Sequence, residues 1–491
     1  MMQGHPANTS YTDQNFQTDQ RLRPLVSDID GTLITTDLLQ EAFLQELRSR
    51  PFTALRVLTS LFKGRAALKT RLAQNVGIDP SELPWNSSVV DFLRKEHQNG
   101  RPVWLASAAS RIYAEKIAEY LGFIDRIFAS SATENCKGER KKELIESVAG
   151  NEGYDYIGDS EADKPLLKAA HQAWVTGPKA NKLMADLTSN GIYLEQIGRS
   201  KNRSLCGRIF HLLRPHHWLK NLLVFLPLIA GHAWFNPTAL TGVVFAFFAF
   251  SLIASAGYIL NDILDLPFDR RHPRKCRRPI ASRELGIPHA LISFAGLMAL
   301  SLMLSLSVGW GLVGFVSGYF VLTLTYSFVL KRKPLIDVLT LALLFNVRIF
   351  AGAFSAELTL SYWLIAFTLF LFFGLAVMKR TNELGDEEDV EISGRGYQSP
   401  DKQVLIPLGV ASSVASAVVL SLYMNSPVVD QLYSHPEWLW LAIPIILIWQ
   451  CGLWISTVRG SMHDDPLVYA VRYPGSYWAG GAILFLFILS L

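Results

Sequence analysis

Long apolar runs dominate the chain after about residue 214, whereas apolar and charged residues are mixed before it. A run of about 18 or more apolar residues is long enough to cross a bilayer as a helix. We therefore predict an all-α polytopic membrane domain over residues 219–491. Its nine expected spans are 219–236, 239–260, 289–308, 310–330, 335–356, 360–378, 403–424, 437–457 and 474–491.

Lys and Arg are distributed unevenly among the segments that connect these spans. The segments after the first, third, fifth and seventh spans contain neither residue, whereas the alternate segments carry clusters such as "RRHPRKCRR" and "KRK". Positive charge is retained on the cytoplasmic side of a membrane. We expect a multi-pass protein of a bacterial inner membrane, with its charged loops and N-terminal domain in the cytoplasm and its C-terminus outside.

Before the first span, short apolar stretches alternate with helical patterns, which is typical of a doubly wound parallel sheet. The strand-like stretches include "PLVSDIDGTL", "PVWLASAAS", "YDYIGDS" and "QAWVTG". We predict an α/β domain with a Rossmann-like sheet over residues 22–195, with a small helical cap at about 38–84. A disordered tail, 1–21, would precede it, and a basic juxtamembrane linker, 196–218, would follow.

Polar side chains stand at or after the ends of these strand-like stretches. Because the carboxyl ends of parallel strands meet at one edge of a sheet, such side chains should converge on one crevice. The side chains expected there are Asp28, Ser107, Lys137 and Asp159.

The stretches "DIDGT", "LASAAS", "CKGERK" and "GDSEAD" resemble the haloacid dehalogenase (HAD) superfamily, in its phosphoserine-phosphatase-like branch. The resemblance implies a phosphatase with Asp28 as nucleophile and Asp30 as general acid/base. Ser107 would hold the transferring phosphoryl group, and Lys137 would neutralise its charge. The oxygen ligands for Mg2+ would be Asp28, Asp30, Asp159 and Asp163.

Net charge and cysteine spacing argue against a nucleic-acid-binding protein, a disulfide-stabilised protein and a zinc protein. The formal charge of +4 is small, and the cations gather in loops beside the predicted spans and not on one soluble face. Neither observation indicates a nucleic-acid partner. The four cysteines are far apart and lack metal-ligand spacing, so we predict neither a disulfide framework nor a zinc site. The sequence leaves the oligomeric state open.

A second acidic group stands where the second predicted span meets its loop, in "NDILDLPFDRRHPRKCRRP". Asp262, Asp265 and Asp269 have the spacing i, i+3, i+7, which places them on one face of an α-helix. Carboxylates beside a bilayer are costly unless they are compensated. We predict that they hold Mg2+, which prefers oxygen ligands and bridges to substrate phosphates.

This pattern, NDxxDxxxD followed by RP, resembles the UbiA-type superfamily of intramembrane transferases. The resemblance implies Mg2+ on the diphosphate of a donor, with Asn261 in the same motif. Arg277 and Arg278 would bind phosphate oxygens. Together these cations would stabilise the charge that develops on the leaving diphosphate.

Members that use prenyl diphosphates usually carry a second motif, DxxxD, in a later loop. Here Leu341 replaces the second aspartate after Asp337. This departure, the basic loop and "LLRPHHWLKNLLVFLPL" resemble decaprenyl-phosphate phosphoribosyltransferases. That resemblance implies phosphoribosyl diphosphate as donor and a polyprenyl phosphate as acceptor. The side chains expected to bind the donor are Lys220, Tyr326, Lys331, Arg348 and Lys379.

Other functions stay open on the sequence. A prenyltransferase that moves a polyprenyl group from its diphosphate to an aromatic acceptor is favoured by the breadth of the superfamily but not by the missing second motif. A transporter or binding protein with a regulatory phosphatase domain would also tolerate intramembrane charge, but we recognise no inverted repeat. For the phosphatase domain we expect the 5-phosphate of the transferase product, with diphosphate or another soluble phosphate ester as alternatives.

Overall fold

A computed structural model describes residues 23–49, 53, 76–130, 136–177, 180–189, 192–198, 205–272, 275–282, 285–384, 396–462 and 466–491. The chain divides into two compact units. The first comprises residues 1–209 together with 262–290, and the second comprises 210–261 together with 291–491. The predicted tail, and residues 50–52 and 54–75 of the predicted cap, lie outside the described part.

A six-stranded parallel sheet forms the centre of the first unit, in the order β3-β2-β1-β4-β5-β6. The strands are β1 (Leu25–Ser27), β2 (Val103–Ser110), β3 (Arg126–Ser130), β4 (Asp155–Gly158), β5 (Ala173–Val175) and β6 (Leu194–Gln196).

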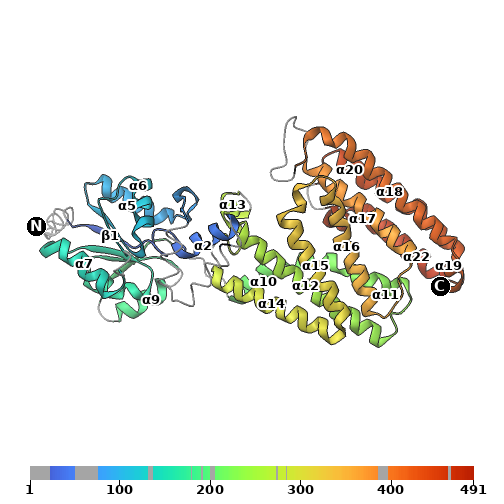
Figure 1. The fold of residues 1–491 in the computed structure, drawn as a ribbon, viewed down its shortest axis with the longest axis horizontal. Coiled ribbons are helices and arrows are strands. Elements are labelled where there is room, and N and C mark those ends of the chain that lie inside the picture. Colours follow the sequence, from blue (N-terminus) through green and yellow to red (C-terminus); the bar gives the residue numbers. More distant parts are fainter. Residues whose placement is uncertain are drawn as a thin grey trace, which may run out of the picture. The chain divides into compact units, whose positions relative to one another are not determined.

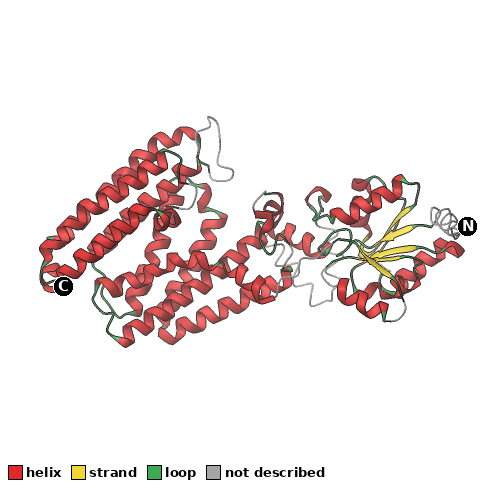
Figure 2. Ribbon diagram, turned by 180° about the vertical axis from the view of Figure 1, so that it is seen from behind, coloured by secondary structure: helices red, strands yellow, loops and turns green. Residues whose placement is uncertain are grey.

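Helices cover both faces of this sheet (Figure 2). Successive strand residues point to opposite faces. Leu25 packs in a core with helices α5 (Ser87–Gln98) and α6 (Arg111–Leu121), whereas Val26 packs in a second core on the other face. That second core receives α7 (Glu139–Ala149), α8 (Lys164–Ala169) and α9 (Ala180–Thr188). The predicted doubly wound α/β fold is confirmed.

The second unit is helical (Figure 1). Its long helices are α12 (Pro237–Leu264), α14 (Ile287–Val308), α15 (Trp310–Phe328), α16 (Ile336–Ser355), α17 (Tyr362–Glu383), α18 (Lys402–Met424), α20 (Ala442–Val458) and α22 (Pro474–Ser490). The described residues contain seven helices that are long and apolar enough to span a membrane. The number is eight if the bent pair of α21 (Pro466–Arg472) and α22 counts as one span. The nine predicted spans are not confirmed.

The difference lies at the first predicted span, residues 219–236. The structure forms a 3-10 helix, η5 (Pro215–Phe225), followed by the short helix α11 (Leu226–Ala230). Pro227 in the first turn of α11 has no N–H to continue an α-helical ladder from η5. The apolar run is therefore present, but it is not one continuous helix.

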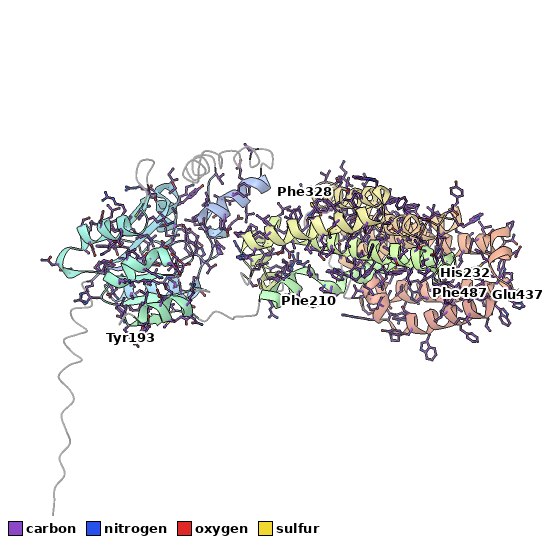
Figure 3. All side chains as sticks on the ribbon, turned by 90° about the horizontal axis from the view of Figure 1, so that it is seen from below. Tyr193, Phe210, His232, Phe328, Glu437 and Phe487 are labelled. Atoms are coloured by element: carbon purple, nitrogen blue, oxygen red, sulfur yellow. The ribbon has the colours of Figure 1, made fainter. Side chains whose placement is uncertain are left out.

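Aromatic contacts close the helical unit between its first and last segments (Figure 3). The ring of His232, after α11, lies 5.6 Å from that of Phe487 in α22. It also lies 4.9 Å from the ring of Tyr433, which follows α19 (Pro427–Leu432). The start of this unit thus packs on its end, although nearly the whole helical sequence separates them.

Candidate active sites

A buried network surrounds Asp28, which directly follows β1. The ammonium of Lys141, in the first turn of α7, donates to Asp28 Oδ1 (3.0 Å) and to Asp163 Oδ1 (3.1 Å). It also donates to the hydroxyl of Tyr156 in β4 (3.0 Å), which in turn donates to Asp163 (2.9 Å). One buried cation therefore compensates two buried carboxylates, which would otherwise be costly to desolvate.

The lysine at this network is Lys141, whereas the sequence motif predicts Lys137. Lys137 is exposed and precedes α7, while Lys141 is only 3% exposed. The stretch "CKGERKK" offers three lysines close together, so the motif alone does not distinguish among them. Tyr156 belongs to no predicted motif. The only sequence feature that could have indicated it is its place in the strand that leads to "GDSEAD".

Three of the predicted metal ligands gather at this site. Asp28, Asp159 and Asp163 bring carboxylate oxygens within 4.8 Å of one another, which suits Mg2+. The fourth, Asp30, accepts the N–H of Leu38 (2.8 Å) at the start of helix α2 (Leu38–Ser49). Gly31, which directly follows Asp30, has φ +79°, and a Cβ at this position would lie 2.1 Å from Asp159 Oδ2. Only glycine allows this approach.

The charges at the site support a cation. Burial raises the pKa of Asp28 to about 6, against the opposing effect of Lys141. Burial, followed by the charges of Asp28 and Asp163, raises the pKa of Asp159 to about 8. The pKa of Asp163 is lowered, because Lys141 and the Ser160 hydroxyl outweigh its burial. The cluster thus carries more negative charge than Lys141 compensates, and a divalent cation would relieve it.

Ser107 lies where strands β2 and β3 lose their regular register, between Ser107 and Ser110. It is fully buried, and its Oγ accepts the N–H of Ala109 (3.0 Å). A serine hydroxyl that accepts one bond still has its own proton to donate. Ser107 therefore has the hydrogen-bonding capacity that its predicted phosphoryl-binding role requires.

The second acidic group lies on two helices and not on one continuous helical face. Helix α12 ends at Leu264, and Pro267 stands in the first turn of the next helix, α13 (Leu266–Arg271). Asp262 and Asp269 are buried, and one terminal nitrogen of Arg278 donates to Asp262 Oδ1 (3.1 Å) and to Asp269 Oδ2 (2.5 Å).

The stretch that carries Asp262, Asp265 and Asp269, here called the acidic loop, already holds one cationic group, the guanidinium of Arg278. Burial raises the pKa of Asp269, while Arg278 acts against this rise. Within the described residues, the three loop aspartates do not form a group with oxygens inside 4.8 Å. A guanidinium holds two of them together, and hard carboxylate oxygens are the donors that Mg2+ prefers. Asn261 precedes Asp262 in α12, and Arg277 is exposed.

In the helical unit, Arg348 is 5% exposed within α16. Its Nε donates to Asn221 Oδ1 (2.7 Å) and one terminal nitrogen donates to the Tyr319 hydroxyl (2.9 Å). The other terminal nitrogen donates to the carbonyl of Leu344. Each of these partners, all within the described residues, is neutral, so no protein carboxylate in this network offsets the charge. Gly352 lets η5 approach α16, because a Cβ there would lie 2.0 Å from the Val224 carbonyl oxygen.

A small cavity in the same unit is lined by two cations and several apolar side chains. Lys220 and Lys379 line it together with Leu341, Phe345, Leu375, Ala376, Pro466 and Leu467. The ring of Phe345 lies 5.8 Å from the Lys220 ammonium and 5.7 Å from the Arg348 guanidinium. Three of the predicted donor-binding cations therefore lie around or beside this cavity.

Sequence analysis missed Arg380, which is fully buried beside Lys379 in α17. Arg380 donates to Asp337, to Glu383 (2.6 Å) and to the hydroxyl of Tyr326 (2.7 Å). The hydroxyl of Tyr397 also donates to Asp337. Tyr326 thus belongs to this network, and Lys331 lies half-buried in the short helix η7 (Leu330–Arg332).

Comparisons with known proteins agree with this architecture. Residues 222–469 match the model of the UbiA prenyltransferase family, and residues 57–168, which begin after Asp28, match that of haloacid dehalogenase-like hydrolases. The uncharacterized protein y4nM of Sinorhizobium fredii is 34% identical over 96% of this chain and 92% of its own length.

Other matches cover a smaller share of the chain. Decaprenyl-phosphate phosphoribosyltransferase of Corynebacterium glutamicum is 36% identical over 38% of this chain and 57% of its own length. The solved structure of a UbiA homolog from Archaeoglobus fulgidus bound to GPP and Mg2+ is 16% identical, with a TM-score of 0.44. The match covers 57% of this chain and 98% of that one.

Proposed function

Because the chain belongs to the UbiA prenyltransferase family, we propose that its helical part transfers a phosphoribosyl group from phosphoribosyl diphosphate to a polyprenyl phosphate, with release of diphosphate. The HAD-like domain then removes the 5-phosphate from the product. This integral membrane protein would lie in a bacterial inner membrane, with the phosphatase domain in the cytoplasm and the C-terminus outside.

The observation that carries the choice of donor is the cavity that Leu341 shares with Lys220 and Lys379. A second acidic motif would place a carboxylate at position 341, where it could hold a further Mg2+. A leucine in a cavity that two lysines also line favours direct binding of a phosphate group by ammonium groups. Asp337, which remains of that motif, is already engaged by Arg380 and Tyr397.

Arg348 supports an anionic substrate for the same part of the chain. A buried arginine with neutral partners carries a desolvation cost that a bound anion would offset. A donor with a diphosphate and a 5-phosphate supplies several such negative groups. Relatives named decaprenyl-phosphate phosphoribosyltransferase support the same donor and acceptor.

The proposed transfer breaks the bond between the anomeric carbon and the diphosphate oxygen. An oxygen of the acceptor phosphate forms the new bond to that carbon. Mg2+ held by Asp262, Asp265 and Asp269 would supply Lewis-acid stabilisation of the leaving diphosphate. Arg278 would exchange its bonds with the aspartates for bonds to diphosphate oxygens. The acceptor phosphate is already anionic, so the reaction needs no general base.

In the HAD-like domain, the Asp28 carboxylate would attack phosphorus while the bond from phosphorus to the ester oxygen breaks. Asp30 would give a proton to that oxygen, and water would then cleave the aspartyl phosphate. Lys141 and Ser107 would bind the phosphoryl oxygens. Fusing both activities in one chain raises the effective concentration of the second centre for the first product.

Membranes containing the protein test both half-reactions. They are incubated with Mg2+, a polyprenyl phosphate and phosphoribosyl diphosphate labelled in its ribose, and a parallel sample carries Asp28→Asn. We expect lipid-soluble label in both samples, with the 5-phosphate retained only in the variant.

The second candidate is prenyl transfer to an aromatic acceptor, which the breadth of the UbiA prenyltransferase family favours. An absence of lipid-soluble label from intact protein would reject the phosphoribosyl donor and favour this candidate. Label that keeps its 5-phosphate in the parent protein would reject only the role proposed for the phosphatase domain.

A further inference from the structure

A bidentate ion pair joins two segments of the first unit that are 229 residues apart in sequence. The terminal nitrogens of Arg270 donate to the two carboxylate oxygens of Glu41, at 3.0 and 2.8 Å. Both side chains are about nine-tenths buried. The Nε of Arg270 is also buried and has no hydrogen-bond partner in the described part of the chain. Glu41 is therefore the group that compensates this buried guanidinium.

Each end of this pair leads to a different candidate active site. Glu41 lies in the first turn of α2, whose first N–H, that of Leu38, donates to Asp30. Arg270 lies in α13 and directly follows Asp269, which Arg278 holds beside Asp262. Helix α2 thus extends from the general acid/base of the phosphatase-like site to the acidic loop of the transferase motif.

A cavity of about 260 Å³ lies beside the pair. One wall is formed by Ser81, Glu82, Leu83 and Pro84, and the other by Pro267, Arg270, Cys276 and Ala281. Gln45 of α2 donates to Glu82 (3.3 Å), so α2 is bonded to both walls. Three segments therefore form the contact, and the Glu41–Arg270 pair is the ion pair within it.

We propose that this surface is the docking contact by which the phosphatase-like domain holds the acidic loop, and that the Glu41–Arg270 pair is its anchor. Removal of either charge leaves the other buried and uncompensated, so the two segments should separate and expose both groups to water. The proposal rests on this contact and not on the substrate of either site. Its failure is therefore distinct from failure of the proposed function.

Cys276 provides a reporter, because it lines the cavity and is partly buried. The test uses the full chain in detergent micelles with Cys206 and Cys451 replaced by serine, while Cys136 is 1% exposed. The rate at which N-ethylmaleimide alkylates Cys276 is followed by mass spectrometry. We expect Glu41→Gln and Arg270→Gln each to raise this rate several-fold. The charge exchange Glu41→Arg with Arg270→Glu should restore the slow rate.

Glu143→Gln is the matched control, because it breaks the exposed Arg140–Glu143 pair (2.8 Å) of α7, whose members do not line the cavity. Its rate should equal that of the parent. Single variants that react at the parent rate would overturn the proposal. An exchanged pair that reacts as fast as the single variants would also overturn it, because the loss of protection would then not depend on the ion pair.

Discussion

Arg278 places one guanidinium nitrogen 3.1 Å from Asp262 and 2.5 Å from Asp269, and so joins the first and last aspartates of the acidic loop. The two carboxylates come from helices that are separated by Asp265. A cation between them allows both to be buried. If the aspartates hold Mg2+ as proposed, the same side chain would compete with the ion for two of its ligands.

This competition predicts that Arg278→Gln binds divalent metal more tightly without donor, by about tenfold, since a charge-assisted hydrogen bond contributes about 1.5–3 kcal/mol. Mn2+ binding can be titrated by electron paramagnetic resonance in a chain that carries Asp159→Asn, which weakens the phosphatase-like metal site. Arg277→Gln is the control, because it removes the same charge from the exposed neighbour. Equal effects of the two changes would contradict the bridging role of Arg278.

Lys141→Met should lower hydrolysis of a small phosphate ester by about 10²–10³-fold or more, the cost of removing one preorganised electrostatic group from an active site. The physical reason is its contact with both Asp28 and Asp163. Hydrolysis of p-nitrophenyl phosphate measures the effect, and thermal unfolding confirms that the variant is folded.

Lys137→Met is the control for this prediction, because Lys137 is exposed. Its hydrolysis rate should remain within a few-fold of the parent rate. A larger loss in Lys137→Met than in Lys141→Met would reject the assignment of Lys141 to the phosphoryl site.

The sequence predicts the doubly wound sheet and the convergence of Asp28, Asp159 and Asp163, because motifs at strand ends define both. It does not distinguish Lys137 from Lys141. That choice depends on which lysine tertiary packing buries, and Lys141 is buried whereas Lys137 is exposed. Arg380 was not predicted from the sequence for a related reason. It adjoins Lys379, and only the packed helix shows that its guanidinium is the one bonded to Asp337.

The raised pKa of Asp159 predicts that the stability of the metal-free protein depends on pH. Its pKa is raised to about 8 in the folded state, so the folded state binds the proton more strongly than the unfolded state does. The resulting stability is present below the ordinary aspartate pKa and is lost as pH rises through about 8. Asp28 contributes a similar loss through about 6.

Thermal unfolding in EDTA between pH 5 and pH 9 measures this dependence. We expect the midpoint of the transition to fall as pH rises, and Mg2+ to diminish the fall by binding the ionised carboxylates. Asp159→Asn should lose the upper part of the fall, since the amide does not ionise. A parent protein whose midpoint rises across this range would show that the carboxylates are stabilised in their charged form.

Leu341→Asp tests whether the cavity with Lys220 and Lys379 binds a donor phosphate directly. A carboxylate there would pair with these ammonium groups and repel phosphate. We expect KM for phosphoribosyl diphosphate to rise by about tenfold, which corresponds to about 1.4 kcal/mol. Leu341→Asn is the control, because asparagine is polar and nearly the same size as aspartate but carries no charge. Its KM should stay near the parent value. If both variants raise KM equally, packing at position 341 and not charge governs the effect. If Leu341→Asp lowers KM in the presence of Mg2+, the cavity binds a metal-bridged diphosphate, as the prenyl-donor alternative requires.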